Sequence, residues 1–251
     1  MIEVKNISKT FNDRPVLQNI STSFEEGKTN LIIGRSGSGK TVLMKTMIGL
    51  LAPDRGDIIY DGRSFHKINK KGKDLIRQEI GMLFQGGALF DSMNVAENVL
   101  FPLQMFSSDT KEEMNKRVEF CLERVGLKYA LNLYPSELSG GMKKRVAIAR
   151  AIANKPKYLF CDEPNSGLDP QTSNLIDQLI LEITKEYNIT TIINTHDMNS
   201  VMEIGERISF IHEGQLWWDG DKKTIFKTDN KELCDFVFCT EFTRLQKSVI
   251  A

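Results

Sequence analysis

The chain has 251 residues, of which 41% are hydrophobic, and this is enough apolar material for a buried core. Its 33 basic and 33 acidic side chains give a formal charge of zero. Proteins that bind nucleic acid usually carry a basic surplus that meets the phosphate backbone, so nucleic acid is not an expected partner.

Residues 1–61 have the pattern of strands separated by turns. Runs with strand character occur at residues 2–4, 29–33 and 57–60, with turn dipeptides between them. One helix, which begins at Lys40, interrupts this part of the chain. Because Met1 leads almost directly into the first strand, we expect neither a signal peptide nor a transit peptide.

The middle of the chain predicts helices, and the part after residue 157 alternates strands with helices. Residues 111–127 repeat apolar side chains at helical spacing, which indicates a helical insert over about residues 90–155. This order favours an α/β fold with a mostly parallel sheet. The predicted elements of the last part are strands at residues 158–161, 190–194 and 208–212 and a helix at residues 170–187.

The cysteines and the last segment carry less specific signals. Cys121, Cys161, Cys234 and Cys239 form no CxxC pair, so we expect separate reduced thiols. Residues 215–251 mix aromatic and charged side chains, which fits either a docking tail or a helix packed on its own domain.

No run of apolar residues in the sequence approaches the roughly 20 that are needed to span a bilayer. Another chain would therefore have to cross any membrane that this protein serves.

The most specific motif is a glycine-rich loop between a predicted strand and a predicted helix, the context of a phosphate-binding P-loop. Its glycines let backbone N–H groups turn toward phosphate oxygens, and the end of the following helix adds positive potential. Lys40 would meet the β- and γ-phosphates, and the Thr41 hydroxyl would ligate Mg²⁺. A chance match is the alternative, and the flanking strand and helix argue against it. The loop consists of Gly34, Arg35, Ser36, Gly37, Ser38, Gly39, Lys40 and Thr41.

Polar side chains follow two later predicted strands. Asp162 can hold Mg²⁺ through its water shell, and Glu163 can accept a proton from the water that attacks the γ-phosphate. An acidic pair at a strand end is otherwise a solvated turn, but a P-loop makes a magnesium partner necessary. His196 follows the strand at residues 190–194, where it could sense the γ-phosphate or steady the attacking water, or have a structural role alone.

A second anion site is indicated at residues 138–142, which we call the signature segment. It precedes a run of good helix formers with an apolar stripe. Ser139, Gly140 and Gly141 would cap that helix, where backbone N–H groups are ready for phosphate, although a plain helix cap is the alternative. A single nucleotide rarely needs two phosphate cradles.

The signature segment, the P-loop and the residues at the strand ends together resemble the motifs of ATP-binding cassette (ABC) proteins, in the family's order, over about residues 1–220. The resemblance implies a P-loop NTPase core with a mostly parallel sheet, an antiparallel β subdomain and a helical insert subdomain. It leaves residues 221–251 as a tail that could contact a partner. In that family two cassettes face head to tail, and each signature segment closes over the γ-phosphate held by the other cassette. A homodimer that binds ATP and Mg²⁺ is therefore expected.

The resemblance also implies roles for single residues. Phe11 would stack on adenine, Gln85 would touch Mg²⁺ and link the site to a membrane partner, and Asp169 would bridge to the opposite site. Glu163 would be the catalytic base and His196 the switch. Mg²⁺ would be held by Thr41, Gln85 and Asp162, and nucleotide by the P-loop together with Phe11, Gln85, Ser139, Gly140, Gly141 and Asp162.

Two features narrow the branch of the family. The first feature is the sequence after Gln85, which reads Gly86-Gly87-Ala88-Leu89-Phe90, and the second is Met142 at the end of the signature segment. Both resemble the bacterial MlaF- and Mkl-type ATPases, which power lipid transport through MCE permeases. Residues 88–90 would form either an apolar surface for the permease or part of the core of the helical insert. This resemblance implies a protein on the cytoplasmic face of the inner membrane.

Two other functions stay open from the sequence. One is the ATPase subunit of an importer for amino acids or other small solutes, which the motifs alone do not exclude. The other is a soluble cassette ATPase that acts on DNA or ribosomes. Proteins of the latter kind usually carry two cassettes or long coiled-coil insertions, and this chain has neither.

Overall fold

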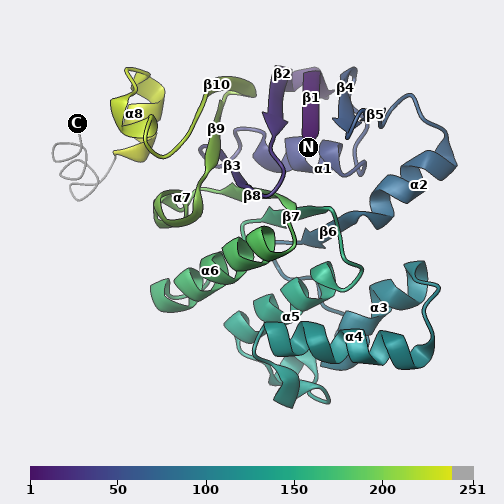
Figure 1. Ribbon diagram of the computed structural model, residues 1–251. Helices are drawn as coiled ribbons and strands as arrows, with labels where there is room; N and C mark the ends of the chain where they lie inside the picture. The colour runs from purple at the N-terminus through teal and green to yellow at the C-terminus, as the bar shows by residue number, and fades with distance from the viewer. Residues whose placement is uncertain (239–251) are drawn as a thin grey trace.

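The computed structural model describes residues 1–238, which form two β-sheets with helices packed around them (Figure 1). One sheet is antiparallel and has four strands in the order β2-β1-β4-β5. Its strands are β1 (Ile2–Phe11), β2 (Arg14–Phe24), β4 (Arg55–Tyr60) and β5 (Arg63–Ser64).

The antiparallel sheet is larger than the sequence pattern indicated. Asn12 and Asp13 both have left-handed backbone angles, with φ of 47° and 61°, and close a tight hairpin between β1 and β2. Only residues 2–4 were predicted as strand in this hairpin. The rest was missed because register shifts after Val4 and Ile7 break the alternation of apolar and polar side chains.

The second sheet has six strands in the order β10-β9-β3-β8-β7-β6. Neighbouring strands from β9 to β6 are parallel, and β10 is added antiparallel at the edge. The α/β fold with a mostly parallel sheet is therefore confirmed. The strands are β3 (Thr29–Ile33), β6 (Ile80–Leu83), β7 (Tyr158–Asp162), β8 (Thr190–Thr195), β9 (Arg207–His212) and β10 (Gln215–Gly220).

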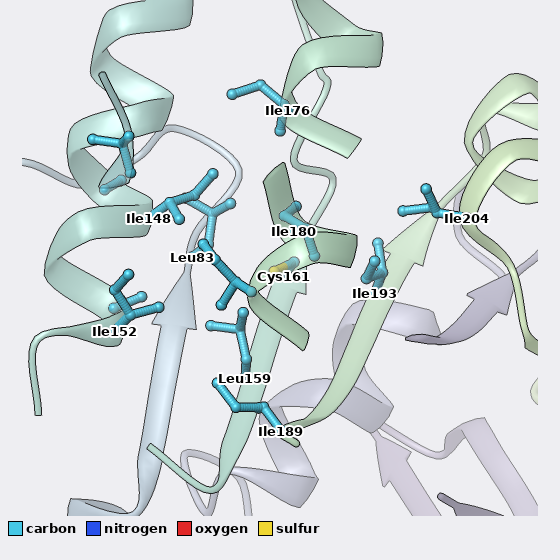
Figure 2. Close-up of a cluster of buried hydrophobic side chains, with 14 of the residues drawn as sticks. Leu83, Ile148, Ile152, Leu159, Cys161, Ile176, Ile180, Ile189, Ile193 and Ile204 are labelled. Carbon is cyan, nitrogen blue, oxygen red and sulfur yellow. The ribbon is translucent and has the colours of Figure 1, made fainter. Parts of the chain in front are cut away.

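Both faces of the central strands are buried, as expected for a parallel sheet covered by helices. In β7, Leu159 and Cys161 point into the core below α5 and α6, and Phe160 points into the core around α1. Figure 2 shows Leu159 and Cys161 with Ile148, Ile180 and Ile193 in the first of these cores. The strand ends are therefore held rigidly, and the polar residues that follow them have fixed positions.

Three helices form a layer at the side of the central sheet that is remote from the antiparallel sheet (Figure 1). These are α3 (Val95–Phe106), α4 (Lys111–Arg124) and α5 (Gly140–Ile152), all of which lie within residues 90–155. Capping boxes begin α3 at Asn94 and α4 at Thr110. The other helices are α1 (Lys40–Met47), α2 (Lys70–Gln78), α6 (Pro170–Glu186) and α7 (Met198–Ile204), with short 3₁₀ turns η1 (Lys128–Ala130), η2 (Pro135–Glu137) and η3 (Ile225–Lys227).

The described part of the C-terminal segment ends in the helix α8 (Lys231–Val237). Leu233 and Val237 are fully buried in the main core, so α8 packs on its own chain. Cys239 and Phe242, which belong to the predicted tail, lie outside the described residues. None of the helices within residues 1–238 has both the length and the apolar composition that a membrane crossing needs.

Candidate functional site

The P-loop joins β3 to α1 and has the backbone conformation of a phosphate cradle. Gly34, Gly37 and Gly39 have φ of 150°, 79° and 106°. A Cβ atom on Gly34 would lie 2.2 Å from the Ile211 carbonyl oxygen, so a larger residue cannot fit there. The glycines predicted from the sequence are therefore required by geometry.

Lys40, the first residue of α1, turns its side chain back into the loop. Its Nζ donates hydrogen bonds to the carbonyl oxygens of Gly34 at 2.8 Å and Arg35 at 3.1 Å. Burial lowers the pKa of the Lys40 ammonium, and the nearby charges of Glu163 and Asp162 partly restore it. The loop thus concentrates positive charge where the sequence predicts the phosphates.

The carboxylate of Asp162, at the end of β7, lies against the start of α1. Its Oδ1 accepts hydrogen bonds from Thr41 Oγ1 at 3.3 Å and from Asn194 Nδ2 at 3.1 Å. Thr41 and Gln85 line one cavity. A hydroxyl, a carboxylate and an amide oxygen are hard donors that suit Mg²⁺, so the three residues predicted to hold it fit the ion. Within residues 1–238 no group of three or more His, Cys, Asp or Glu side chains could hold a metal ion by itself.

Glu163 follows directly and takes a strained backbone conformation. Its φ is 49°, a left-handed value that costs a residue with a Cβ about 1–2 kcal/mol. The backbone N–H donates to the Asn194 carbonyl at 3.0 Å, and the side chain lies 2.9 Å from Nδ1 of His196. Since the carboxylate accepts, Nδ1 carries the hydrogen. The two residues predicted to act on the attacking water are therefore in contact.

Lys40, Thr41, Glu163 and His196 line one cavity of about 670 Å³, and Asp162 is not among its lining residues. Its lining combines the P-loop with side chains from other parts of the chain, namely Val16, Gln85, Glu163, His196, Met198, Asp235 and Phe236. Phe11 is not part of this lining. It lies 40% exposed at the end of β1, with the Lys9 ammonium 5.3 Å from its ring centre. The predicted stacking of Phe11 on adenine stays a prediction.

The segment after β6, residues 85–90, which we call the Gln85 loop, is held by α5. Lys144 donates to the backbone oxygens of Gln85 and, at 3.3 Å, of Glu163, and Arg150 donates to those of Gly87 and Ala88 at 2.7 Å each. Lys144 and Arg150 were not singled out from the sequence. Their contacts are with backbone atoms far along the chain, and the only local signal is a basic residue on a buried helix face.

The signature segment lies at a different cavity from the P-loop. Ser139 caps α5 and its Oγ accepts a hydrogen bond from Met142 N at 3.3 Å. The helix begins at Gly140, earlier than the sequence indicated, so both glycines are in its first turn. Ser139, Gly140 and Gly141 line a cavity of about 520 Å³ together with Asp169, and none of them lines the P-loop cavity. The two predicted phosphate sites are separate in one chain.

Several known proteins are similar to this chain in sequence. The family model described as ABC transporter matches residues 17–166. A methionine import ATP-binding protein of Clostridium tetani is 41% identical over 93% of this chain and 73% of its own length. A protein of Mycobacterium leprae named as a probable ribonucleotide transport ATP-binding protein is 35% identical over 94% of this chain and 68% of its own length.

Solved structures have the same fold. The ATP-binding cassette MJ0796, in a dimeric post-hydrolysis state bound to ADP and phosphate, gives a TM-score of 0.80 at 32% identity and covers 88% of this chain and 98% of that one. The protein cbiO1 of Clostridium perfringens, part of an ABC transporter complex, gives a TM-score of 0.84 at 31% identity with 98% of both chains covered.

Proposed function

The chain belongs to the ABC transporter family and is an ATPase, and from this premise we propose that two copies of it form the motor of a membrane transporter. One observation carries the proposal. The P-loop and the signature segment line separate cavities, so neither cavity alone contains both phosphate sites. Head-to-tail pairing of two copies would bring the P-loop of each to the signature segment of the other. A related cassette has been solved as a dimer with ADP and phosphate, which supports this pairing.

In the proposed site the P-loop and Lys40 bind the triphosphate of ATP. Glu163 accepts a proton from water as the water oxygen bonds to the γ-phosphorus and the bond to the β–γ bridging oxygen breaks. His196 keeps the Glu163 carboxylate oriented through the 2.9 Å contact. Ser139 and Gly141 of the second copy donate hydrogen bonds to the γ-phosphate.

Thr41, Gln85 and Asp162 are the residues that would hold Mg²⁺ in this site. The ion, when bound with ATP, neutralises charge on the β- and γ-phosphates. Asn194 has a supporting role, because its bond to Asp162 fixes the carboxylate beside Thr41.

Mixing two inactive variants tests the pairing. Lys40→Ala removes P-loop function and Ser139→Arg blocks the signature segment, so each variant alone should be inactive. A mixed dimer has one intact site, made by the P-loop of the Ser139→Arg copy and the signature segment of the Lys40→Ala copy. We expect an equimolar mixture to regain about a quarter of the wild-type ATPase rate, since half of the dimers are mixed and each has one of two sites. Absence of any recovery would contradict the paired site.

The Gln85 loop provides the proposed contact with the permease. Phe90 and Phe106 are 40% and 48% exposed and line an apolar groove of about 390 Å³ with Phe84 and Phe101. The groove has a rigid wall, because Asn98 donates to the Phe90 carbonyl at 3.1 Å and accepts from its N–H at 2.8 Å. An exposed apolar groove with a fixed wall suits an amphipathic helix of an integral membrane subunit.

Phe90→Asp tests the groove. We expect the variant to keep its own ATPase rate, because Phe90 lies outside the nucleotide cavity. Its recovery with membrane permease subunits should fall about 30-fold, since loss of a central aromatic contact costs about 2 kcal/mol or more. Co-purification from membranes measures this. Tyr129→Asp is the matched control, because Tyr129 is 74% exposed in η1 and does not line the groove. Equal recovery of the two variants would contradict the docking role.

For the cargo, the relatives support the importer interpretation more than lipid transport. The similar proteins that are 38–41% identical include methionine import ATP-binding proteins from several bacteria. Import of amino acids or similar small solutes is therefore the first candidate. From the sequence motifs, lipid transport was the main interpretation and import of small solutes was the alternative.

Lipid transport is the second candidate and rests on two local features. These are the sequence of the Gln85 loop and Met142 at the signature segment, both of which are similar to the lipid-transport branch. A lipid permease of the MCE type would then be the partner, and the chain would lie on the cytoplasmic face of the inner membrane. A soluble cassette without a permease is the least supported alternative, because the apolar groove would have no occupant.

Identification of the membrane proteins that purify with the chain separates these candidates. Recovery of a solute-importer permease would support the import of small solutes. Recovery of an MCE permease would support lipid transport. Recovery of ribosomes or DNA with no membrane protein would contradict both transport functions.

A further inference from the structure

Lys144 is a buried lysine of α5 that the mechanism above does not use. The residue is 5% exposed and lies on the helix face that also buries Ala147, Ile148 and Ala151. It is not among the residues that line the P-loop cavity. Burying an ammonium costs free energy unless hydrogen bonds replace those that water makes, and an apolar side chain of similar length would avoid this cost. Packing alone therefore does not explain a lysine at this position.

The Lys144 ammonium bridges the ends of two neighbouring strands. β6 and β7 are paired in parallel as far as Leu83 and Cys161. Gln85 and Glu163 each lie two residues beyond this last pair. Both of their carbonyl oxygens accept hydrogen bonds from Lys144 Nζ, that of Glu163 at 3.3 Å. The lysine thus holds together two backbone segments that the sheet no longer joins.

The backbone of Glu163 needs support from its surroundings, because its φ of 49° is strained. Its N–H donates to the Asn194 carbonyl at 3.0 Å, and its carbonyl accepts from Ser166 N at 3.2 Å as well as from Lys144. The bond from Ser166 lies within the same loop, whereas the bond from Lys144 comes from α5. Lys144 therefore ties the loop of the proposed base to a helix outside it.

The charge of Lys144 acts at the same place. Burial lowers the pKa of its ammonium, and nearby negative charges, those of Glu163 and Asp162 among them, act in the opposite direction. Lys40 is under the influence of the same two carboxylates. The two lysines approach them from different elements, Lys40 from the start of α1 and Lys144 from α5. Together they offset the repulsion between the two carboxylates.

We propose that Lys144 is a positioning residue for ATP hydrolysis, which holds the Gln85 loop and the backbone of Glu163 at a fixed separation and so keeps the Glu163 carboxylate aimed at the attacking water. The inference rests on the proposed role of Glu163 as the base. Loss of Lys144 lowers turnover and leaves ATP binding, which the P-loop supplies, nearly unchanged.

Substitution of Lys144 tests the proposal. Lys144→Met nearly keeps the length of the side chain but has no donor, so we expect kcat to fall about 10-fold while KM for ATP changes less than about twofold. Lys144→Arg keeps the charge and can donate to two oxygens at once, so it should retain at least about half of the wild-type kcat. Lys116→Met makes the same change at an exposed lysine of α4 and should behave as the wild type.

A double substitution separates positioning from a general structural role. If Lys144 acts through Glu163, Lys144→Met should cost less than about threefold in a chain that already carries Glu163→Gln, because the base that it positions is gone. A structural role elsewhere in the fold would give the same loss in both backgrounds. Single-turnover hydrolysis of radiolabelled ATP measures the slow rates, and thermal unfolding checks that each variant folds.

The outcomes separate this inference from the proposed function. A wild-type kcat for Lys144→Met, an equal loss in both backgrounds, or a kcat for Lys144→Arg as low as that for Lys144→Met overturns the positioning role. Should Lys144→Met fail to fold, Lys144→Gln takes its place in the same comparison, since its shorter, uncharged amide cannot donate to both carbonyls. Full turnover by Glu163→Gln alone would instead overturn the proposed hydrolysis site.

Discussion

Glu163→Gln should lose at least about 100-fold in kcat, the usual contribution of a positioned general base. The amide that replaces the carboxylate has the same size, and its oxygen can still accept from Nδ1 of His196. It cannot take a proton from water. The backbone bonds of residue 163 to Asn194 and Lys144 are unchanged, so the strained loop conformation should persist.

ATP binding should survive this substitution, because the P-loop is untouched. The variant should therefore accumulate as a dimer with ATP bound, which size-exclusion chromatography with ATP measures beside steady-state hydrolysis. Glu119→Gln, on the exposed face of α4, is a control that should behave as the wild type. Normal turnover by Glu163→Gln would refute the role of this carboxylate as the base.

Lys40→Ala should weaken ATP binding about 100-fold, because charge-assisted hydrogen bonds to phosphate contribute about 1.5–3 kcal/mol each. The buried ammonium is held 2.8 Å from the Gly34 carbonyl, inside the loop that surrounds the phosphates. Removing it leaves the loop's N–H groups but takes away the full positive charge.

Binding of a fluorescent ATP analogue measures the loss, with thermal unfolding as a check that the variant folds. Lys45→Ala is the matched control, since Lys45 is an exposed lysine in the last turn of the same helix. If the two variants bound ATP equally well, Lys40 would not be a phosphate ligand.

Much of the site could be predicted because its residues are close in sequence to strong local signals. The P-loop lies between a buried strand and a helix. Asp162 is the last residue of a buried strand, and Glu163 and His196 each follow a buried strand directly. Strands that are buried on both faces have continuous runs of apolar residues. The ends of such strands can therefore be predicted from the sequence.

The parts that were missed depend on contacts between distant segments. The hairpin of β1 and β2 has bulges that disrupt its alternation, and β10 is an edge strand whose side chains are only partly buried. Lys144 and Arg150 donate to backbone atoms that only folding brings close. A charged residue in a helical segment is normally taken as solvated, and no sequence pattern distinguishes these two from the others.

Helix α5 has Ser139 at its beginning and Arg150 near its end, with Lys144 between them. Thirteen residues of α-helix form a rod about 20 Å long. In the proposed dimer the Ser139 end would meet the triphosphate of the opposite copy, while Arg150 near the other end holds the Gln85 loop through the Gly87 and Ala88 carbonyls. A displacement of one end of this helix would then move the other end. ATP binding to one copy would thereby be coupled to the proposed permease contact of the other.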